Sequence, residues 1–296
     1  MRRKNDILWK GMLEEIFDDL LRFIFPEADH VFDLQKGFEF LDKELSEMYP
    51  EPDKNPDTRF VDKLVKVFQP DGSEEWLLVH VEVQGQMDRL FAERMFRYYY
   101  RIFDRYQRPV TAIAIFTGAD GKSIPDRYSH SFLGTHLEYR YNTMRVTEYQ
   151  DEVLSASDNP FALVILAAKK ALLAGKVPEL ELANQKLLIA RLLYEKKLYE
   201  RKKIEGILTF LNNYVLFEDQ ETNSIFTKEL DRITGKNYTM GIIEQLAEIK
   251  VQEEREKNSR LFVENLLKGT DFSLEKIASL AGVSVAFVEK MKVSSK

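Results

Sequence analysis

Apolar residues near the start of the chain recur every three or four positions, the spacing of one face of a helix. The pattern runs through Leu8, Met12, Ile16 and Leu20 and predicts an amphipathic helix over residues 6–25, which ends before a proline. The next apolar stretch, 32–45, follows neither period clearly, and a first strand within it stays open.

The pattern then changes to alternation, which is typical of strands. Two alternating runs, 59–68 and 75–84, are separated by the turn Pro70-Asp71-Gly72-Ser73, so the sequence predicts an antiparallel hairpin. Helical spacing returns over 90–106, and a run of Val, Ala, Ile and Phe predicts a buried strand over 110–117.

A strand, a helix and a further strand in this order form a crossover, which joins parallel strands. Residues 136–149 are expected to add one more strand or a hairpin, and from Asp151 onward the pattern is almost entirely helical. We therefore expect an α/β fold with a mixed central sheet flanked by helices, followed by an all-helical C-terminal region. The expected boundary lies between domains 1–150 and 151–296.

Composition excludes some classes of protein and some metal sites. No apolar run reaches the roughly 18 residues that span a bilayer, and no apolar signal-peptide core is present, so we expect a cytoplasmic protein without membrane contact. The chain has 0 cysteines, and its 4 histidines are not at metal-ligand spacing. Any metal is therefore expected to be a hard cation held by carboxylates.

Charge is unevenly distributed although the net charge is only −6. Residues 11–57 contain 14 Asp and Glu against 4 Lys and Arg, and residues 169–203 contain 10 Lys and Arg against 4 Glu. Two interpretations remain open at this point: ordinary solvated helix faces, or a metal-holding half beside a phosphate-holding surface.

The segment Val79-His80-Val81-Glu82-Val83-Gln84 carries the candidate chemistry. Alternation places His80, Glu82 and Gln84 on one face of the expected strand, and the hairpin brings Asp62 of the preceding strand near Glu82. Two converging carboxylates repel each other unless a cation lies between them. The alternative from spacing alone is a polar outer face of the sheet, with His80 an ordinary hydrogen-bonded strand residue.

These features, with the acidic first helix and the crossover, resemble the PD-(D/E)XK nuclease superfamily, whose fold is restriction-endonuclease-like. More closely, the first 150 residues resemble the Rpn family of recombination-promoting nucleases and transposases. The segments that carry the resemblance are Asp6–Lys10, Phe40–Leu45, Val61–Val67, His80–Gln84, Arg94–Tyr98 and Asp104–Tyr106.

The resemblance implies a metal-dependent endonuclease that hydrolyses DNA phosphodiester bonds in recombination or mobile-element activity. Asp62 and Glu82 match the metal-binding acids, and the implied cofactor is Mg²⁺ or Mn²⁺. Gln84 stands where the usual pattern has lysine, and it would place the water. The superfamily often adds an acid from its first helix, for which Glu14 and Glu15 are candidates. Because glutamine offers an amide and no charge, a degenerate nuclease fold that binds DNA or a protein without cutting is the alternative.

A row of arginines in the expected 90–106 helix is the candidate DNA surface. Arg94, Arg97, Arg101 and Arg105 follow helical spacing and form one stripe, beside an apolar stripe that should pack on the sheet. Such guanidinium groups hold phosphates well, so DNA is the expected partner. The alternative is an ordinary charged flank paired with neighbouring acids.

The C-terminal segment 273–288 resembles a helix-turn-helix. An Ile-Ala pair, the Gly282 turn and the N-cap Ser284 before a second helix fit that motif. The second helix offers few side chains for reading bases, so we favour a docking or structural role. Homo-oligomer contacts through the C-terminal helices are a further expectation.

Overall fold

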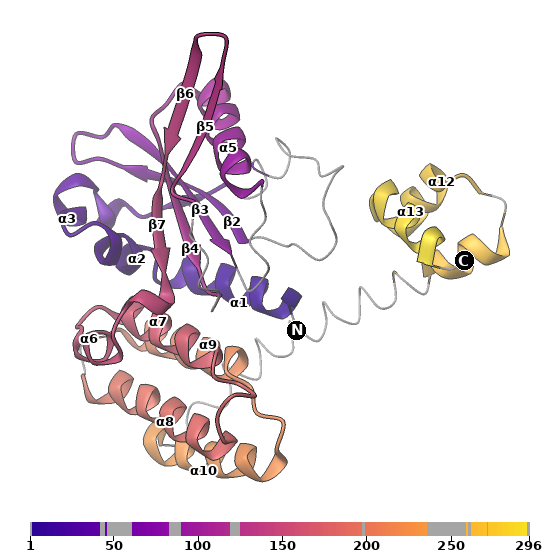
Figure 1. The fold of residues 1–296 in the computed structure, drawn as a ribbon. Helices are drawn as coiled ribbons and strands as arrows, with labels where there is room; N and C mark the ends of the chain where they lie inside the picture. The colour runs from indigo at the N-terminus through magenta and orange to yellow at the C-terminus, as the bar shows by residue number, and fades with distance from the viewer. Residues whose placement is uncertain are drawn as a thin grey trace. The chain divides into compact units, whose positions relative to one another are not determined.

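The computed structural model describes residues 2–41, 45, 61–82, 90–118, 125–196, 199–235, 259, 262–270 and 272–294. The chain forms two compact units, Met1–Tyr238 and Thr239–Lys296. Figure 1 shows a mixed α/β arrangement in the first unit, with an open sheet, helices against it and a group of helices further along the chain. The boundary that the sequence predicts between residues 150 and 151 lies inside this first unit.

The first helix of the sequence prediction is two helices in the structure. Helix α1 spans Arg2–Glu15 and α2 spans Phe17–Ile24, and the backbone leaves helical geometry at Ile16, with φ −132° and ψ 37°. Ile16 is nevertheless fully buried, together with Leu13 and Phe17. The apolar spacing therefore predicted the buried face but not the change of direction within it. Short α3 (Ala28–Val31) and a 3₁₀ turn (Leu34–Lys36) follow.

Five strands form the main sheet in the order β1-β2-β3-β4-β7. Their bounds are Glu39–Phe40, Val61–Phe68, Glu74–Glu82, Val110–Phe116 and Asn142–Arg145. The first three strands pair antiparallel, whereas β4 runs parallel to β3 and to β7. The expected hairpin and the crossover are both confirmed, and the open question about 32–45 is settled by β1, a short edge strand.

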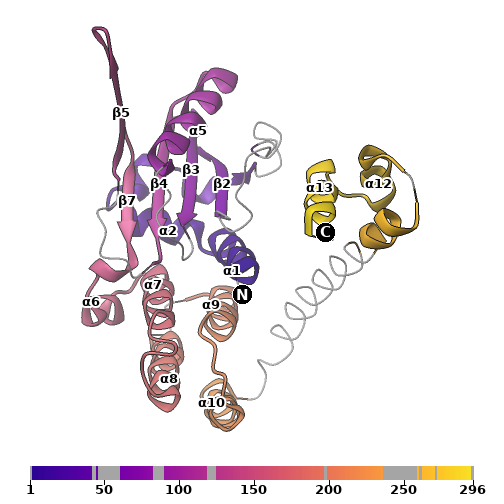
Figure 2. The ribbon, with the colours of Figure 1, turned by 45° about the vertical axis from the view of Figure 1, so that its right-hand side comes forward.

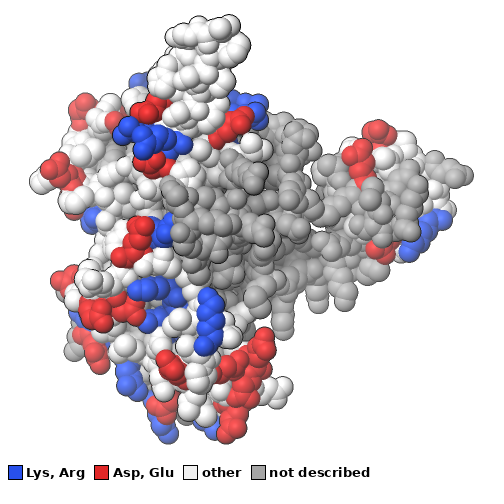
Figure 3. All heavy atoms as spheres, viewed as in Figure 1, with Lys and Arg blue, Asp and Glu red and all other residues white. Residues whose placement is uncertain are grey.

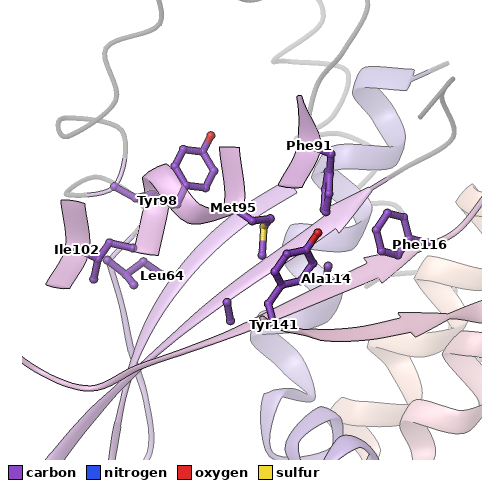
Figure 4. Close-up of a cluster of buried hydrophobic side chains, with 10 residues drawn as sticks. Leu64, Phe91, Met95, Tyr98, Ile102, Ala114, Phe116 and Tyr141 are labelled. Atoms are coloured by element: carbon purple, nitrogen blue, oxygen red, sulfur yellow. The ribbon is translucent and has the colours of Figure 1, made fainter. Parts of the chain in front are cut away.

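Helix α5 (Phe91–Tyr106) covers one face of this sheet (Figure 4). Its apolar stripe is buried, as predicted, and packs against strand residues that all point to the same face. The members of this cluster include Leu64, Phe91, Met95, Tyr98, Ile102, Ala112, Ala114, Phe116 and Tyr141. Helix α1 contacts β2 from the opposite face, where its Glu14 meets Lys63.

Strands β5 (Arg127–Phe132) and β6 (Thr135–Arg140) form a separate antiparallel hairpin. In the views of Figures 1 and 2 this hairpin projects well beyond the main sheet. The sequence predicted one more strand or a hairpin over 136–149. That range holds β6, β7 and a 3₁₀ turn at Val146–Glu148, and β5 was not predicted.

Helices fill the rest of the first unit, as the spacing from Asp151 onward predicts. They are α6 (Asp151–Ala156), α7 (Pro160–Ala171), α8 (Glu179–Glu195), α9 (Arg201–Tyr214) and α10 (Gln220–Thr234). Helix α9 packs on α1, and the indole of Trp9 makes edge contacts with Phe210 and Tyr214 at centroid distances of 5.1 and 6.1 Å. These helices are therefore part of the body that holds the sheet.

The second unit contains the predicted helix pair, α12 (Leu274–Ala281) and α13 (Val285–Ser294). Ser273 accepts a hydrogen bond from the Lys276 backbone, Ser284 accepts one from the Phe287 backbone, and Gly282 turns the chain at φ 64°. The pair shares a small core with the preceding segment 262–270, and this core is built from Val263, Ile277, Ala278 and Val288. Throughout the described ranges, none of the helices combines the length and apolarity that crossing a bilayer requires.

Candidate functional site

The backbone register places Asp62 and Glu82 on the same face of the sheet. Asp62 pairs with His80 across the antiparallel β2–β3 ladder, and Glu82 lies two residues further along β3. Side chains two apart on a strand share a face, as do directly paired residues. The structure describes these residues as strand backbone, and their side chains lie outside the described part.

Independent pairings show which face this is. Leu64, two residues after Asp62 in β2, belongs to the cluster beneath α5. Phe116, which pairs with Glu82 across the parallel β3–β4 ladder, belongs to the same cluster. Asp62 and Glu82 are therefore located on the α5 face, near the ends of their strands.

The described side chains by themselves form no metal cluster. Among them no group of three or more His, Asp or Glu is arranged to hold an ion. Gln84, the third residue of the predicted site, lies outside the described residues, which resume at Leu90. The role of all three residues stays a prediction.

Glu14 has a partner on the other face of the sheet. Its carboxylate pairs with the ammonium of Lys63, a side chain that is 0% exposed and lies 4.9 Å from the ring centre of Phe40. Lys63 alternates with Asp62 along β2, so the two belong to opposite faces. The structure thus brings Glu14 to the sheet but places its carboxylate away from the Asp62 face.

Acids of α1 and α2 pair with the basic N-terminal part of α9. Glu15 lies 3.1 Å from the ammonium of Lys202, and Lys203 lies 2.9 Å from Asp18 and also bonds Asp19. Burial opposes ionisation of Asp18, but hydrogen bonds from Lys203 and its other basic neighbour hold its pKa below the ordinary value. Burial raises the pKa of Asp19, and the adjacent charge of Asp18 adds to this effect. Glu15 thus has a basic partner here.

The basic stretch 169–203 supplies other internal contacts as well. Lys169 and Lys170 both pair with Asp151 at the start of α6. Lys186 of α8 is buried at 3% exposure, and burial lowers its pKa from 10.5 to about 7. These contacts favour the interpretation that much of this stretch stabilises the fold.

The ammonium of Lys186 lies at the C-terminal end of α9. It donates to the carbonyl oxygens of Val215 at 2.9 Å and Asn212 at 3.3 Å, and it lies over the rings of Phe226 and Phe217 at 4.1 and 4.8 Å. Helix C-terminal carbonyls and aromatic faces both attract a cation. The sequence showed only a lysine within an apolar helix and did not identify this site.

The arginine stripe of α5 divides into two environments. Arg94 is half-buried, with its guanidinium 5.3 Å from the ring centre of Phe91. Arg97 is 66% exposed and pairs with Glu93, while Arg101 and Arg105 are exposed on following turns. The outer arginines therefore form the surface row that the spacing predicted, and DNA binding by that row stays a prediction.

Charged side chains of both signs alternate on the surface in Figure 3, and the projecting end of the β5–β6 hairpin carries neither Lys, Arg, Asp nor Glu.

No protein-family model matches the chain, and no curated protein or solved structure matches it either.

Proposed function

We propose that the chain is a metal-dependent endodeoxyribonuclease of the PD-(D/E)XK type, related to the Rpn family. The observation that carries the proposal is the shared face of Asp62 and Glu82. An antiparallel hairpin followed by a parallel crossover is the arrangement in which this superfamily presents its acids, and it supports a restriction-endonuclease-like fold.

The donor set fits a hard divalent cation. Residues in the diagonal relation of Asp62 and Glu82 are about 7–8 Å apart, close enough for two carboxylates to reach one ion between them. Mg²⁺ or Mn²⁺ held there would lower the pKa of a bound water and offset charge on the scissile phosphate.

Other residues of the chain would position the water and bind the DNA. Gln84 is two residues after Glu82, so a continued strand would present its amide on the same face, where it would orient the attacking water. Helix α5 packs on this face through its apolar stripe, and its arginine stripe would hold DNA phosphates. Lys63 cannot replace the lysine that Gln84 displaces, because it belongs to the opposite face and pairs with Glu14.

One observation favours a second function. Glutamine at position 84 offers a neutral amide where lysine would offer a positive charge to the water or the phosphate. A protein of this kind that binds DNA or a protein partner without cutting it is therefore the alternative.

A plasmid-nicking assay separates the two functions. Purified protein is incubated with supercoiled plasmid in Mg²⁺, in Mn²⁺ and in EDTA, and the products are resolved on a gel. The enzyme proposal predicts nicking that requires metal and that Asp62→Ala abolishes. Glu152→Gln, which removes an exposed acid of α6, is the matched control and should nick like the wild type. Metal-independent nicking, or nicking by Asp62→Ala, would refute the proposal, and binding without nicking would establish the alternative.

A further inference from the structure

The β5–β6 hairpin ends in two apolar side chains that are largely exposed. Phe132 is 66% exposed and Leu133 is 89% exposed, the latter the highest value among the large apolar residues of the described chain. Burial of such side chains is what normally stabilises a fold. The tip therefore contributes little to the stability of this protein.

The turn itself carries a conformational cost. Leu133 and Gly134 both have positive φ, 44° and 82°, the pattern of a two-residue type I′ turn. Glycine and asparagine adopt this region easily, whereas a leucine does so at a cost in energy. A leucine that is both strained and exposed gains nothing within the folded chain, which points to a contact outside it.

The outer part of the hairpin carries no fixed charge. Between Tyr128 and Leu137 there is no Asp, Glu, Lys or Arg, and the polar residues are serine, threonine and histidine. Hydroxyl and imidazole groups donate hydrogen bonds to phosphates and base edges. No carboxylate in this stretch would repel a polyanion.

The base of the hairpin is anchored on α5, the helix of the arginine stripe. Tyr128 stacks on Phe96 at 5.2 Å between ring centres, and Tyr139 contacts Tyr99 at 4.7 Å. Arg97 of the stripe follows Phe96 directly in the helix, so the stripe passes close to the base of the hairpin.

We propose that the hairpin enters a groove of duplex DNA and that Phe132 and Leu133 insert between base pairs as a wedge. The proposal rests on duplex DNA being the substrate of the proposed function, but not on cleavage. Two-stranded ribbons enter the minor groove as well as the major groove, and the six-residue arms of this hairpin extend about 20 Å, which is long enough for its tip to reach the bases from the minor groove. Apolar wedges of this kind unstack one base step and kink the duplex.

The size of the apolar tip argues against a protein partner. A stable protein interface covers about 800 Å² on each partner, far more than two side chains provide. A base step, in contrast, is a target of matching size, because one or two apolar side chains fill the gap that opens between bases.

The test measures unstacking in the absence of catalytic metal. The full chain in EDTA is titrated into a synthetic duplex that carries 2-aminopurine beside a central TA step, a step that unstacks easily. At saturating protein, the wild type should raise the 2-aminopurine fluorescence. Leu133→Asn should abolish that rise, and Phe132→Ser should also weaken binding by about tenfold.

Stability and specificity controls accompany the titration. Leu133→Asn should keep or raise the melting temperature, because asparagine suits the type I′ turn, so a missing signal cannot be attributed to unfolding. Leu188→Gln removes an exposed leucine from α8 and should behave like the wild type.

The proposal is overturned if the hairpin variants and the wild type give the same fluorescence and affinity. It is equally overturned if the variants instead abolish self-association in sedimentation, or binding to anionic vesicles, while DNA signals stay unchanged. The fluorescence titration contains no metal, so its result does not depend on cleavage. A protein that raises the fluorescence but never nicks plasmid would support the wedge proposal and refute only the nuclease assignment.

Discussion

Lys186→Met should change how the stability of the first unit depends on pH. Burial lowers the pKa of Lys186 from 10.5 to about 7, so the unfolded chain binds a proton there that the folded chain releases between these two values. Stability therefore rises with pH across this window, and the cost of the buried ammonium is present in full below it.

The magnitude follows from the two pKa values. At about 1.4 kcal/mol per pH unit, the difference between 10.5 and about 7 amounts to about 5 kcal/mol of destabilisation at acidic pH. Between pH 6 and 9 the wild type should recover about 2–3 kcal/mol of this through Lys186 alone. For a unit of this size, that gain corresponds to a rise of roughly 5–10 °C in melting temperature.

Thermal melts of both proteins from pH 6 to 9 provide the assay. Methionine has a similar length and no charge, so the difference in melting temperature between variant and wild type should move in favour of the wild type as the pH rises. At any single pH, the sign of this difference in melting temperature also depends on the carbonyls of Asn212 and Val215, because they no longer receive a hydrogen bond in the variant. Lys176→Met, at an exposed loop lysine, should leave the slope unchanged. Parallel curves for wild type and Lys186→Met would refute the reasoning.

Three further predictions concern the proposed nuclease site. Isothermal titration should show that Asp62→Ala abolishes Mg²⁺ or Mn²⁺ binding, and unchanged binding would remove Asp62 from the site. The double variant Arg97→Ala, Arg101→Ala should lower the slope of log affinity for duplex DNA against log salt, by about 0.9 for each phosphate that it no longer neutralises. If the slope stays at the wild-type value, the stripe is only a solvated flank of the helix. Glu82→Gln should give a folded protein that binds DNA without metal at least as well as the wild type, because one repulsive carboxylate is gone. Its cleavage should fall by orders of magnitude, so a nuclease assay, gel shift and melt on one preparation test the mechanism, which an active variant contradicts.

Local patterns predicted the elements that position the candidate site. Alternation and the turn at residues 70–73 were enough to place Asp62 and Glu82 on one face, because the length of a hairpin turn determines the register of its strands. The apolar stripe of α5 predicted which side of that helix packs on the sheet, and the Gly282 turn with the Ser284 cap predicted the C-terminal helix pair.

Long-range contacts were beyond such patterns. Nothing near Glu14 in the sequence indicates that its partner is Lys63, and nothing near Asp19 indicates Lys203, 184 residues away. The break at Ile16 was missed because the apolar spacing continues through it, and β5 was missed because its residues are mostly exposed. Alternation within a strand predicts its buried face only where one of its two faces is buried. The β5–β6 hairpin buries little of either face.

The packing of α1 against α9 has a consequence for how the protein is made. Trp9 is fully buried, and two of its neighbours, Phe210 and Tyr214, are synthesised some 200 residues later. The sheet strands will all have left the ribosome before α9 does, so the N-terminal helix must wait with its indole uncovered. At about 5–20 residues per second, that delay lasts roughly ten seconds or more. During this interval the nascent chain exposes aromatic surface that α9 covers once it has been made.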